Sequence, residues 1–106
     1  MRLIDLEIVI DVVTGTNKSK SPRGVRNEVA KRRGLGRSIV TDAIRRVEAN
    51  MGVSLFESDS VTLTPSGKAM ADHGPPFIET QRIFVEFVQK GHLRVRSENP
   101  NKWNAP

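Results

Sequence analysis

Cysteine is absent from the 106 residues, which excludes disulfide bridges and thiolate-bound metal sites. Aromatic residues are few, with four Phe, one Trp and no Tyr, so a hydrophobic core has to be built from Val, Ile and Leu. The longest apolar stretch, residues 8–13, is interrupted by Asp11 and is far too short to cross a bilayer. The N-terminus also lacks the basic and then apolar pattern of a signal peptide. We therefore expect a cytoplasmic protein that does not interact with membranes.

The usual sequence features of enzymes are also missing. His73 and His92 are isolated, and no group of His, Asp and Glu has the spacing of metal ligands. The Gly34-Leu35-Gly36 triplet does not follow a predicted strand, so it is a turn and not a phosphate-binding fingerprint. His73 is interpreted as a polar residue at a helix end. We expect no enzymatic activity, no cofactor and no bound metal.

Positive charge is concentrated in one window of the chain. The formal net charge is +5, and residues 17–46 hold ten of the 17 Lys and Arg residues but only two acids, Glu28 and Asp42. The window carries +8 and the remaining residues together carry −3. Such a concentration favours a surface that faces a polyanion, because cations placed near phosphates release condensed counterions. A solvated basic face without a partner is the open alternative.

Apolar residues in the first half recur with the period of an α-helix. The pattern predicts helices over residues 3–13, 23–33 and 37–50, with a polar loop over residues 14–22. Leu35 lies between two glycines in the turn between the second and third helices, and its side chain is expected to pack into the core. The residues expected to face inward are Leu6, Val9, Ile10 and Val13, then Val25, Val29 and Ala30, then Val40, Ala43, Ile44, Val47 and Met51.

Short strands and further helices are predicted in the second half. Residues 53–57 and 61–64 have the pattern of a β-hairpin. Thr64-Pro65 is a typical helix start, and Pro75-Pro76 should kink or stop that helix. Another helix is predicted from residue 76 to about residue 89, and Trp103 lies in a polar tail that has lost the helical pattern.

The order of these elements predicts a mainly α fold, a winged helix-turn-helix with a short β-hairpin wing and a C-terminal dimerisation helix. The predicted divisions are a DNA-binding domain over residues 1–74, a linker helix over residues 75–90 and a tail over residues 91–106. The segment 37–50 has an apolar and a polar face, as a recognition helix needs. One α-helix fits the major groove of DNA and reads base edges with its outward side chains.

Three segments carry a family resemblance: GLGRSIVTDAIRRVE at residues 34–48, MGVSLFE at 51–57 and LTPSG at 63–67. Together they resemble the N-terminal DNA-binding domain of bacterial LysR-type transcriptional regulators, over about residues 3–90. The resemblance implies a homodimer that binds double-stranded DNA at an inverted repeat. Full members of that family continue into an inducer-binding domain, so no small-molecule inducer is expected for this chain. Whether the chain is a whole regulator or an excised domain stays open.

By this resemblance, base reading falls on the start of the recognition helix. Arg37, Ser38 and Thr41 take the reading positions, and Ile39 takes a position that meets a thymine methyl. Arg45 falls where a base or phosphate contact is common. Arginine at a helix N-terminus is disfavoured by the helix dipole, which supports a functional role for Arg37. Surface roles remain the alternative for Arg37 and, more strongly, for Ser38 and Thr41.

The sequence departs from the family at several positions. Asp42 replaces a cation or amide, Ser58 replaces an arginine, and Arg33 replaces a buried leucine. Either the Arg33 stem packs while its head reaches solvent, or the alignment of that helix is shifted by one residue. Phosphate contacts are then expected from a basic insertion after the first helix and from the second helix, with a structural role as the alternative for Arg46. The expected phosphate contacts are Lys18, Lys20, Arg23, Arg26, Lys31, Arg32, Arg46 and Ser60.

The helix predicted after residue 76 matches the family's linker helix, which pairs two subunits. Its apolar residues belong either to an internal core or to a dimer interface, and the dimer is preferred because the preceding domain has its own core. The residues expected at this interface are Phe77, Thr80, Ile83, Phe84, Phe87 and Val88.

Two other functions remain open from the sequence. One is an architectural or accessory DNA-binding protein of a mobile element, which binds without strong sequence preference. The other is a winged-helix module that docks another regulator through its apolar helix. The preferred prediction is a sequence-specific transcriptional regulator.

Overall fold

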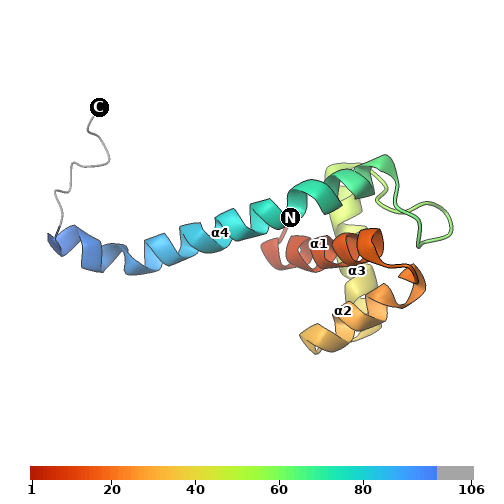
Figure 1. The fold of residues 1–106 in the computed structure, drawn as a ribbon, viewed down its shortest axis with the longest axis horizontal. Coiled ribbons are helices and arrows are strands. Elements are labelled where there is room, and N and C mark those ends of the chain that lie inside the picture. Colours follow the sequence, from red (N-terminus) through yellow and green to blue (C-terminus); the bar gives the residue numbers. More distant parts are fainter. Residues whose placement is uncertain (98–106) are drawn as a thin grey trace. The chain divides into compact units, whose positions relative to one another are not determined.

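The computed structural model describes residues 1–97, with side chains up to residue 91. Trp103 and the rest of the predicted tail beyond residue 97 lie outside the described residues. The chain divides into two compact units, Met1–Pro75 and Pro76–Pro106. The elements in chain order (Figure 1) are α1 (Leu3–Lys18), the 3₁₀ turn η1 (Pro22–Gly24), α2 (Val25–Arg33), α3 (Arg37–Met51) and α4 (Pro65–Ser97).

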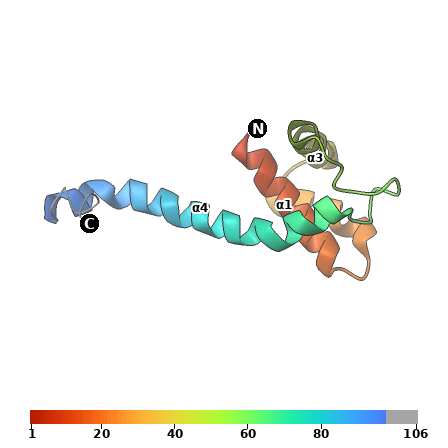
Figure 2. The same cartoon turned by 90° about the horizontal axis from the view of Figure 1, so that it is seen from above.

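The helix α1 contacts both α2 and α3, which also contact each other. Figure 2 shows α3 almost end-on beside α1. Helix α1 continues five residues past the predicted end at Val13, so most of the expected basic loop is helical. Gly15 lies close to the start of α2, since a Cβ added there would meet Val25 Cγ1 at 2.9 Å. The glycine therefore lets α1 approach α2 in the part of the chain that was expected to be a loop.

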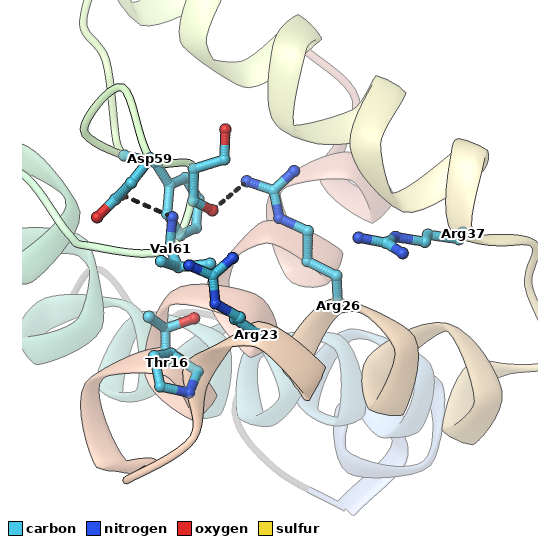
Figure 3. A pocket seen from close by; sticks show the side chains of 9 residues that line it. Thr16, Arg23, Arg26, Arg37, Asp59 and Val61 are labelled. Atoms are coloured by element: carbon cyan, nitrogen blue, oxygen red, sulfur yellow. Dashed lines mark hydrogen bonds between the residues drawn. The ribbon is translucent and has the colours of Figure 1, made fainter.

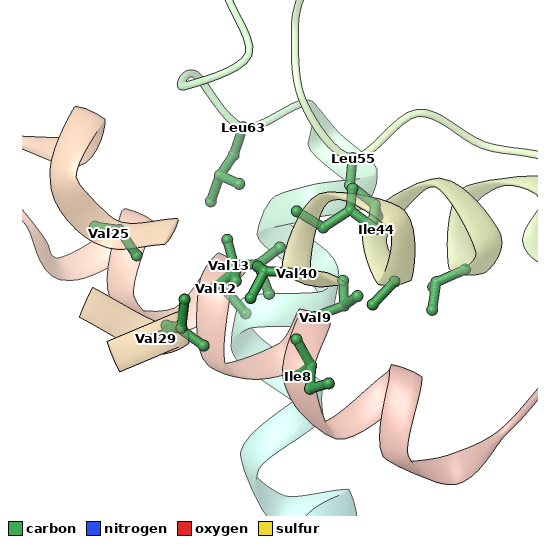
Figure 4. Close-up of a cluster of buried hydrophobic side chains, with 14 residues drawn as sticks. Ile8, Val9, Val12, Val13, Val25, Val29, Val40, Ile44, Leu55 and Leu63 are labelled. Carbon is green, nitrogen blue, oxygen red and sulfur yellow. The ribbon is translucent and has the colours of Figure 1, made fainter. Parts of the chain in front are cut away.

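One hydrophobic core joins these helices within the first unit. In Figure 4 the α1 residues Val12 and Val13 lie between Val29 of α2 and Ile44 of α3. Every residue predicted to face inward from α2 is buried, as are the first four predicted from α3. Met51 is 43% exposed, so its prediction was wrong, because it lies in the last turn of α3 beyond the core. The core residues are Ile8, Val9, Val12, Val13, Val25, Val29, Ala30, Val40, Ala43, Ile44, Val47, Leu55, Leu63 and Ala71.

The turn between α2 and α3 has the geometry expected from its glycines. Gly34 ends α2 with φ 68°, a left-handed conformation that glycine adopts without steric cost. The Leu35 amide donates to the carbonyl of Ala30 at 2.8 Å, and the Leu35 side chain packs partly buried against the core. The predicted packing of Leu35 is confirmed, and it sets where α3 begins.

The predicted β-hairpin wing was wrong. No β-strand occurs in residues 1–97, and a loop over residues 53–64 (the 53–64 loop) takes its place. A single antiparallel bridge between Phe56 and Leu63 is all that remains of the expected pairing. The mainly α part of the predicted fold class agrees with the structure, but the winged architecture does not.

Local hydrogen bonds explain why the 53–64 loop does not form strands. The Asp59 carboxylate accepts from the amides of Val61 and Thr62 at 3.0 and 2.8 Å. Ser60 has φ 65°, and its amide donates to the carbonyl of Glu57 at 2.9 Å. Side chains of Asp compete with a strand ladder in this way, by offering backbone donors a nearby acceptor.

Helix α4 is one helix of 33 residues. Pro75-Pro76 was predicted to kink or stop the helix, and the stop, with a separate helix from residue 76, was wrong. Each proline removes one backbone hydrogen bond of the helix, but its fixed φ lies in the helical range. The residues on both sides keep the helical backbone conformation. Residues 91–97 also belong to α4, where a tail was expected. The first turns of α4 pack tightly in the first unit, since a Cβ at Gly74 would lie 2.8 Å from Ile10 Cγ2.

Candidate nucleic-acid interface

Helix α3 presents two chemically different faces. Val40, Ala43, Ile44 and Val47 are buried at 3% exposure or less. The predicted base readers lie outside this buried stripe. Arg37, Ser38, Ile39 and Arg45 are exposed, Ile39 by 46%, while Thr41 is half-buried. The start of α3 therefore offers cationic, hydroxyl and apolar groups at one surface, as a helix that enters the major groove requires.

Arg46, a predicted phosphate contact, is instead held by the first turn of α1. Its Nε and Nη2 donate to the two carboxylate oxygens of Asp5 at 2.9 and 3.0 Å. Asp5 is only 3% exposed, and Arg2 also donates to it. The hydrogen bond from Arg46, with a further contribution from Arg2 and against the effect of burial, lowers the pKa of Asp5 to about 2. The structure gives Arg46 the structural role that the sequence left open.

Arg33 is explained by a second ion pair between helices. Its Nη2 lies 2.6 Å from Asp11 Oδ2, and its Nε donates to the same oxygen at 2.8 Å. The Arg33 side chain is 28% exposed, so it occupies the edge of the core and reaches a carboxylate on α1. Arg33 thus has a structural role, because its ion pair with Asp11 connects α2 to α1.

Arg26 connects α2 to the 53–64 loop. Its guanidinium lies 4.7 Å from the centroid of the Phe56 ring, and Nη2 donates to the Ser60 carbonyl at 3.0 Å. Ser60, predicted at a DNA phosphate, therefore contributes its carbonyl to this internal contact. The cation–π geometry and the hydrogen bond hold the loop beside α2. This loop position brings Phe56 between α2 and α3.

Two arginines and one glutamate of α3 act on the Arg26 guanidinium. Burial has the largest effect in lowering the pKa of Arg26, and repulsion from Arg37 lowers it further. Arg45 lowers it as well, while the Glu48 carboxylate acts in the opposite direction. Glu48 itself is bonded to the loop, since its Oε2 accepts from the Leu55 amide at 2.7 Å. Arg37 and Arg45 of α3 thus both act electrostatically on Arg26 of α2.

Two shallow hollows lie on either side of Arg26, and Phe56 and Ser60 line both of them. The first hollow, of about 140 Å³, is also lined by Thr16, Arg23, Arg37, Asp59 and Val61 (Figure 3). The second hollow, of about 240 Å³, is also lined by Thr41, Arg45, Glu48, Ser54 and Glu57. Both are smaller than the roughly 300–1,000 Å³ usual for small-molecule sites. Their polar linings suit groups on the surface of a larger ligand.

The other predicted phosphate contacts are exposed and spread over two helix ends. Lys18 and Lys20 lie at and just after the end of α1, and Lys31 and Arg32 lie in the last turn of α2. Arg23 lies in η1 beside the first hollow. Arg45 has a weak ion pair with Asp42, at 4.0 Å and with both side chains more than half exposed. The structure therefore brings Arg23, Arg26 and Arg37 to one hollow, and no lysine lines it.

The residues predicted at a dimer interface lie in α4. Phe84 and Val88 are more than 60% exposed, and Phe77, Ile83 and Phe87 are between 41% and 48% exposed. Thr80 is exposed too. Large apolar side chains exposed to this degree are typical of a surface that binds another molecule. On another side of α4, Arg82 donates to Glu79 and Glu86 at 2.6 and 3.0 Å.

Four residues that make these contacts were not predicted from the sequence: Asp5, Glu48, Phe56 and Asp59. Asp59 is exposed, and hydrogen bonds from Thr62, with a further one from the Val61 amide, lower its pKa to about 2. The Asp-x-x-Thr spacing at residues 59–62 is typical of a turn in which the aspartate side chain accepts hydrogen bonds from the residues that follow it. For Asp5 no local signal exists, because its main partner lies 41 residues away.

Residues 1–97 contain no group of three or more His, Asp or Glu side chains that could hold a metal ion. None of the helices in the same part of the chain has the length and apolarity needed to cross a membrane. Comparisons with models of protein families, with curated proteins and with solved structures found no match to this chain in any of the three.

Proposed function

We propose that the protein is a sequence-specific, double-stranded DNA-binding transcriptional regulator that acts as a dimer in the cytoplasm. The observation that supports this best is the surface shared by α2 and α3. There Arg37, at the exposed start of α3, and Arg45, further along the same helix, both repel the guanidinium of Arg26 on α2. Arginines that repel one another at a surface favour an anionic ligand, and the phosphates of DNA supply one.

In this proposal α3 enters the major groove. Its buried valines, alanine and isoleucine fix its rotation, so the side chains of Ser38, Ile39 and Arg45 point to the base edges. Arg45 can donate two hydrogen bonds to guanine, Ser38 can bond to several bases, and Ile39 can contact a thymine methyl. The resemblance of residues 34–48 to the recognition segment of LysR-type regulators supports the same assignment.

Lys18, Lys20, Lys31 and Arg32 are proposed to contact phosphates. These four side chains are exposed and lie at the ends of α1 and α2. Phosphate contacts of this kind set the register of α3 on the duplex but do not read the sequence.

A second copy of the chain is the proposed partner for the exposed apolar residues of α4. One copy carries a single reading helix, and two copies related by a twofold axis would read the two halves of an inverted repeat. The exposure of Phe84 and Val88, at 64% and 63%, supports this use of the helix.

The proposal can be tested with a duplex selected from a randomised library, labelled with a fluorophore. Binding is followed by anisotropy in the presence of excess mixed-sequence competitor DNA. Retention on the selected duplex supports a regulator. Weak and uniform binding to all duplexes supports an architectural role instead, and no binding at all supports a protein-interaction module. Either of these last two results overturns the proposal.

A further inference from the structure

The first hollow gathers three arginines from three separate elements. Arg23 comes from η1, Arg26 from the first turn of α2 and Arg37 from the first residue of α3. Figure 3 shows Arg23 and Arg26 rising from neighbouring turns, while Arg37 extends from the start of α3 toward Arg26. The chain thus brings residues up to 14 positions apart in sequence to one small concavity.

The protein balances the charges in this hollow only in part, since three arginines and one carboxylate, that of Asp59, line it. Within residues 1–91, none of the three arginines has a carboxylate oxygen within 4.0 Å. Asp59 attracts Arg23 electrostatically, but both of its oxygens already accept hydrogen bonds from the loop residues Val61 and Thr62, and its single charge leaves a net positive charge among the residues that line the hollow. A partly buried charge without a counterion is unfavourable, because the lost hydration is not replaced.

Arg26 has hydrogen-bonding capacity to spare. An arginine side chain carries five N–H donors, and in the described part of the chain one of them is used, by the Ser60 carbonyl. Its guanidinium is also fixed in place over Phe56. Donors that are held in position before a ligand arrives lose little entropy on binding.

The size and chemistry of the hollow limit what it accepts. Its volume of about 140 Å³ is below that of a site for a whole small molecule. Guanidinium groups prefer carboxylate and phosphate oxygens, which they bind in pairs. A tetrahedral group with several oxygens satisfies three converging arginines better than a planar carboxylate with two.

We infer that the first hollow is a binding site for one phosphate group, held jointly by Arg23, Arg26 and Arg37. If the phosphate is a phosphodiester of a DNA backbone, this inference rests on the proposed function. Arg37 then contacts the backbone and does not read a base. A free phosphate compound would use the same chemistry. In either case the site ties the start of α3 to η1 and the 53–64 loop through one bound anion.

Titration with inorganic phosphate at low ionic strength tests the site without DNA. The Nε–Hε signals of Arg23, Arg26 and Arg37 in a two-dimensional NMR spectrum should shift together with one dissociation constant. Arg82, whose guanidinium is engaged by Glu79 and Glu86, serves as the internal control and should not move. The double variant R23Q/R37Q keeps the Arg26–Phe56 contact and should bind phosphate at least about tenfold more weakly. Equal shifts at Arg82, or an unchanged constant in the double variant, would overturn the inference.

The salt dependence of binding to a mixed-sequence duplex separates one shared phosphate from independent contacts. Each neutralised phosphate contributes about 0.9 to the slope of log K against log salt. R23Q/R37Q should lower the slope by no more than about that amount if both arginines serve the same phosphate, because Arg26 still contacts it. A loss of about twice that amount would show two separate contacts and would contradict the shared site. The control R82Q/K90Q removes the same charge outside the hollow and should leave the slope unchanged.

The two measurements also distinguish this inference from the proposed function. Phosphate binding at the hollow with no binding of any duplex would reject the DNA proposal while supporting a site for a free phosphate compound. Weak, millimolar binding of inorganic phosphate together with the slope change supports a site whose natural ligand is a phosphate of the DNA backbone. Duplex binding with no response of the three arginines would leave the DNA proposal standing and would reject the site.

Discussion

Asp5 and Arg46 form a two-point ion pair that joins the first turn of α1 to the second half of α3. The two hydrogen bonds are 2.9 and 3.0 Å long, and the carboxylate is almost completely removed from solvent. A bidentate arginine–carboxylate pair fixes direction as well as distance. Asp5 therefore acts as a positioning residue for α3, the helix proposed to read DNA.

Replacing Asp5 with Asn should reduce the free energy of unfolding by about 1–3 kcal/mol, because Arg46 and Arg2 lose their charged acceptor. Urea denaturation followed by circular dichroism measures this change. Arg82→Gln is the control, since it breaks two exposed ion pairs, with Glu79 and Glu86, and should lower the free energy of unfolding much less than Asp5→Asn does. Equal losses for the two variants would contradict the role given to Asp5.

The same pair predicts a pH dependence of a definite sign. The folded-state pKa of Asp5 is about 2, below its ordinary value of 3.8, so its contribution to stability is fully present above about pH 4. The contribution should disappear as the pH falls from 3.8 through 2. The difference in unfolding free energy between the wild type and Asp5→Asn should therefore be constant near neutral pH and shrink in acid. A difference that persists at pH 2 would argue against the lowered pKa.

Gly67 and Gly91 provide a matched pair for testing the packing of α4. A Cβ at Gly67 would lie only 2.2 Å from the Leu55 carbonyl oxygen, whereas a Cβ at Gly91 would meet nothing within 4 Å. Gly67→Ala should therefore destabilise the protein by about 1–3 kcal/mol through overpacking. Gly91→Ala should be neutral or stabilising by up to about 1 kcal/mol, because alanine favours a helix. Thermal unfolding of the two variants checks the opposite signs.

The two-copy arrangement predicts a change of mass when the apolar face of α4 is charged. Phe84→Glu places a carboxylate where 64% of a phenyl ring is exposed, and burying that charge against a second copy is unfavourable. Sedimentation equilibrium should then give the mass of a monomer. Arg82→Gln alters the charge by the same amount on another side of the helix and should remain dimeric. A wild-type protein that sediments as a monomer would contradict the proposed dimer.

The predictable parts of the fold are those that depend on local patterns. The α3 stripe from Val40 to Val47 and the Gly34-Leu35 turn follow from helical periodicity and from the conformational range of glycine, so the sequence was sufficient for both. The wing was wrong because the alternating residues near Phe56 suggested a strand. In the structure the Asp59 side chain takes up backbone donors that a strand would have used.

The candidate site was predictable in its residue types but not in its arrangement. The outward face of α3 could be read from the sequence. The contacts of Arg26 with Phe56 and Ser60 join parts of the chain 30 and 34 residues apart, and no periodic pattern reports on such contacts. Two arginines, Arg33 and Arg46, form ion pairs between helices, and others lie around Arg26, a division that only the three-dimensional arrangement shows.

The most direct test of the central claim compares the base preferences of three proteins in a selection from randomised duplexes. If α3 reads DNA, the wild type should enrich a motif with twofold symmetry. Arg45→Ala should lose its preference at one base pair in each half, at a cost of about 1–3 kcal/mol for the selected site. The control Arg82→Ala should enrich the wild-type motif unchanged. A wild type that enriches no motif, or an Arg45→Ala variant that enriches the wild-type motif in full, would contradict the account.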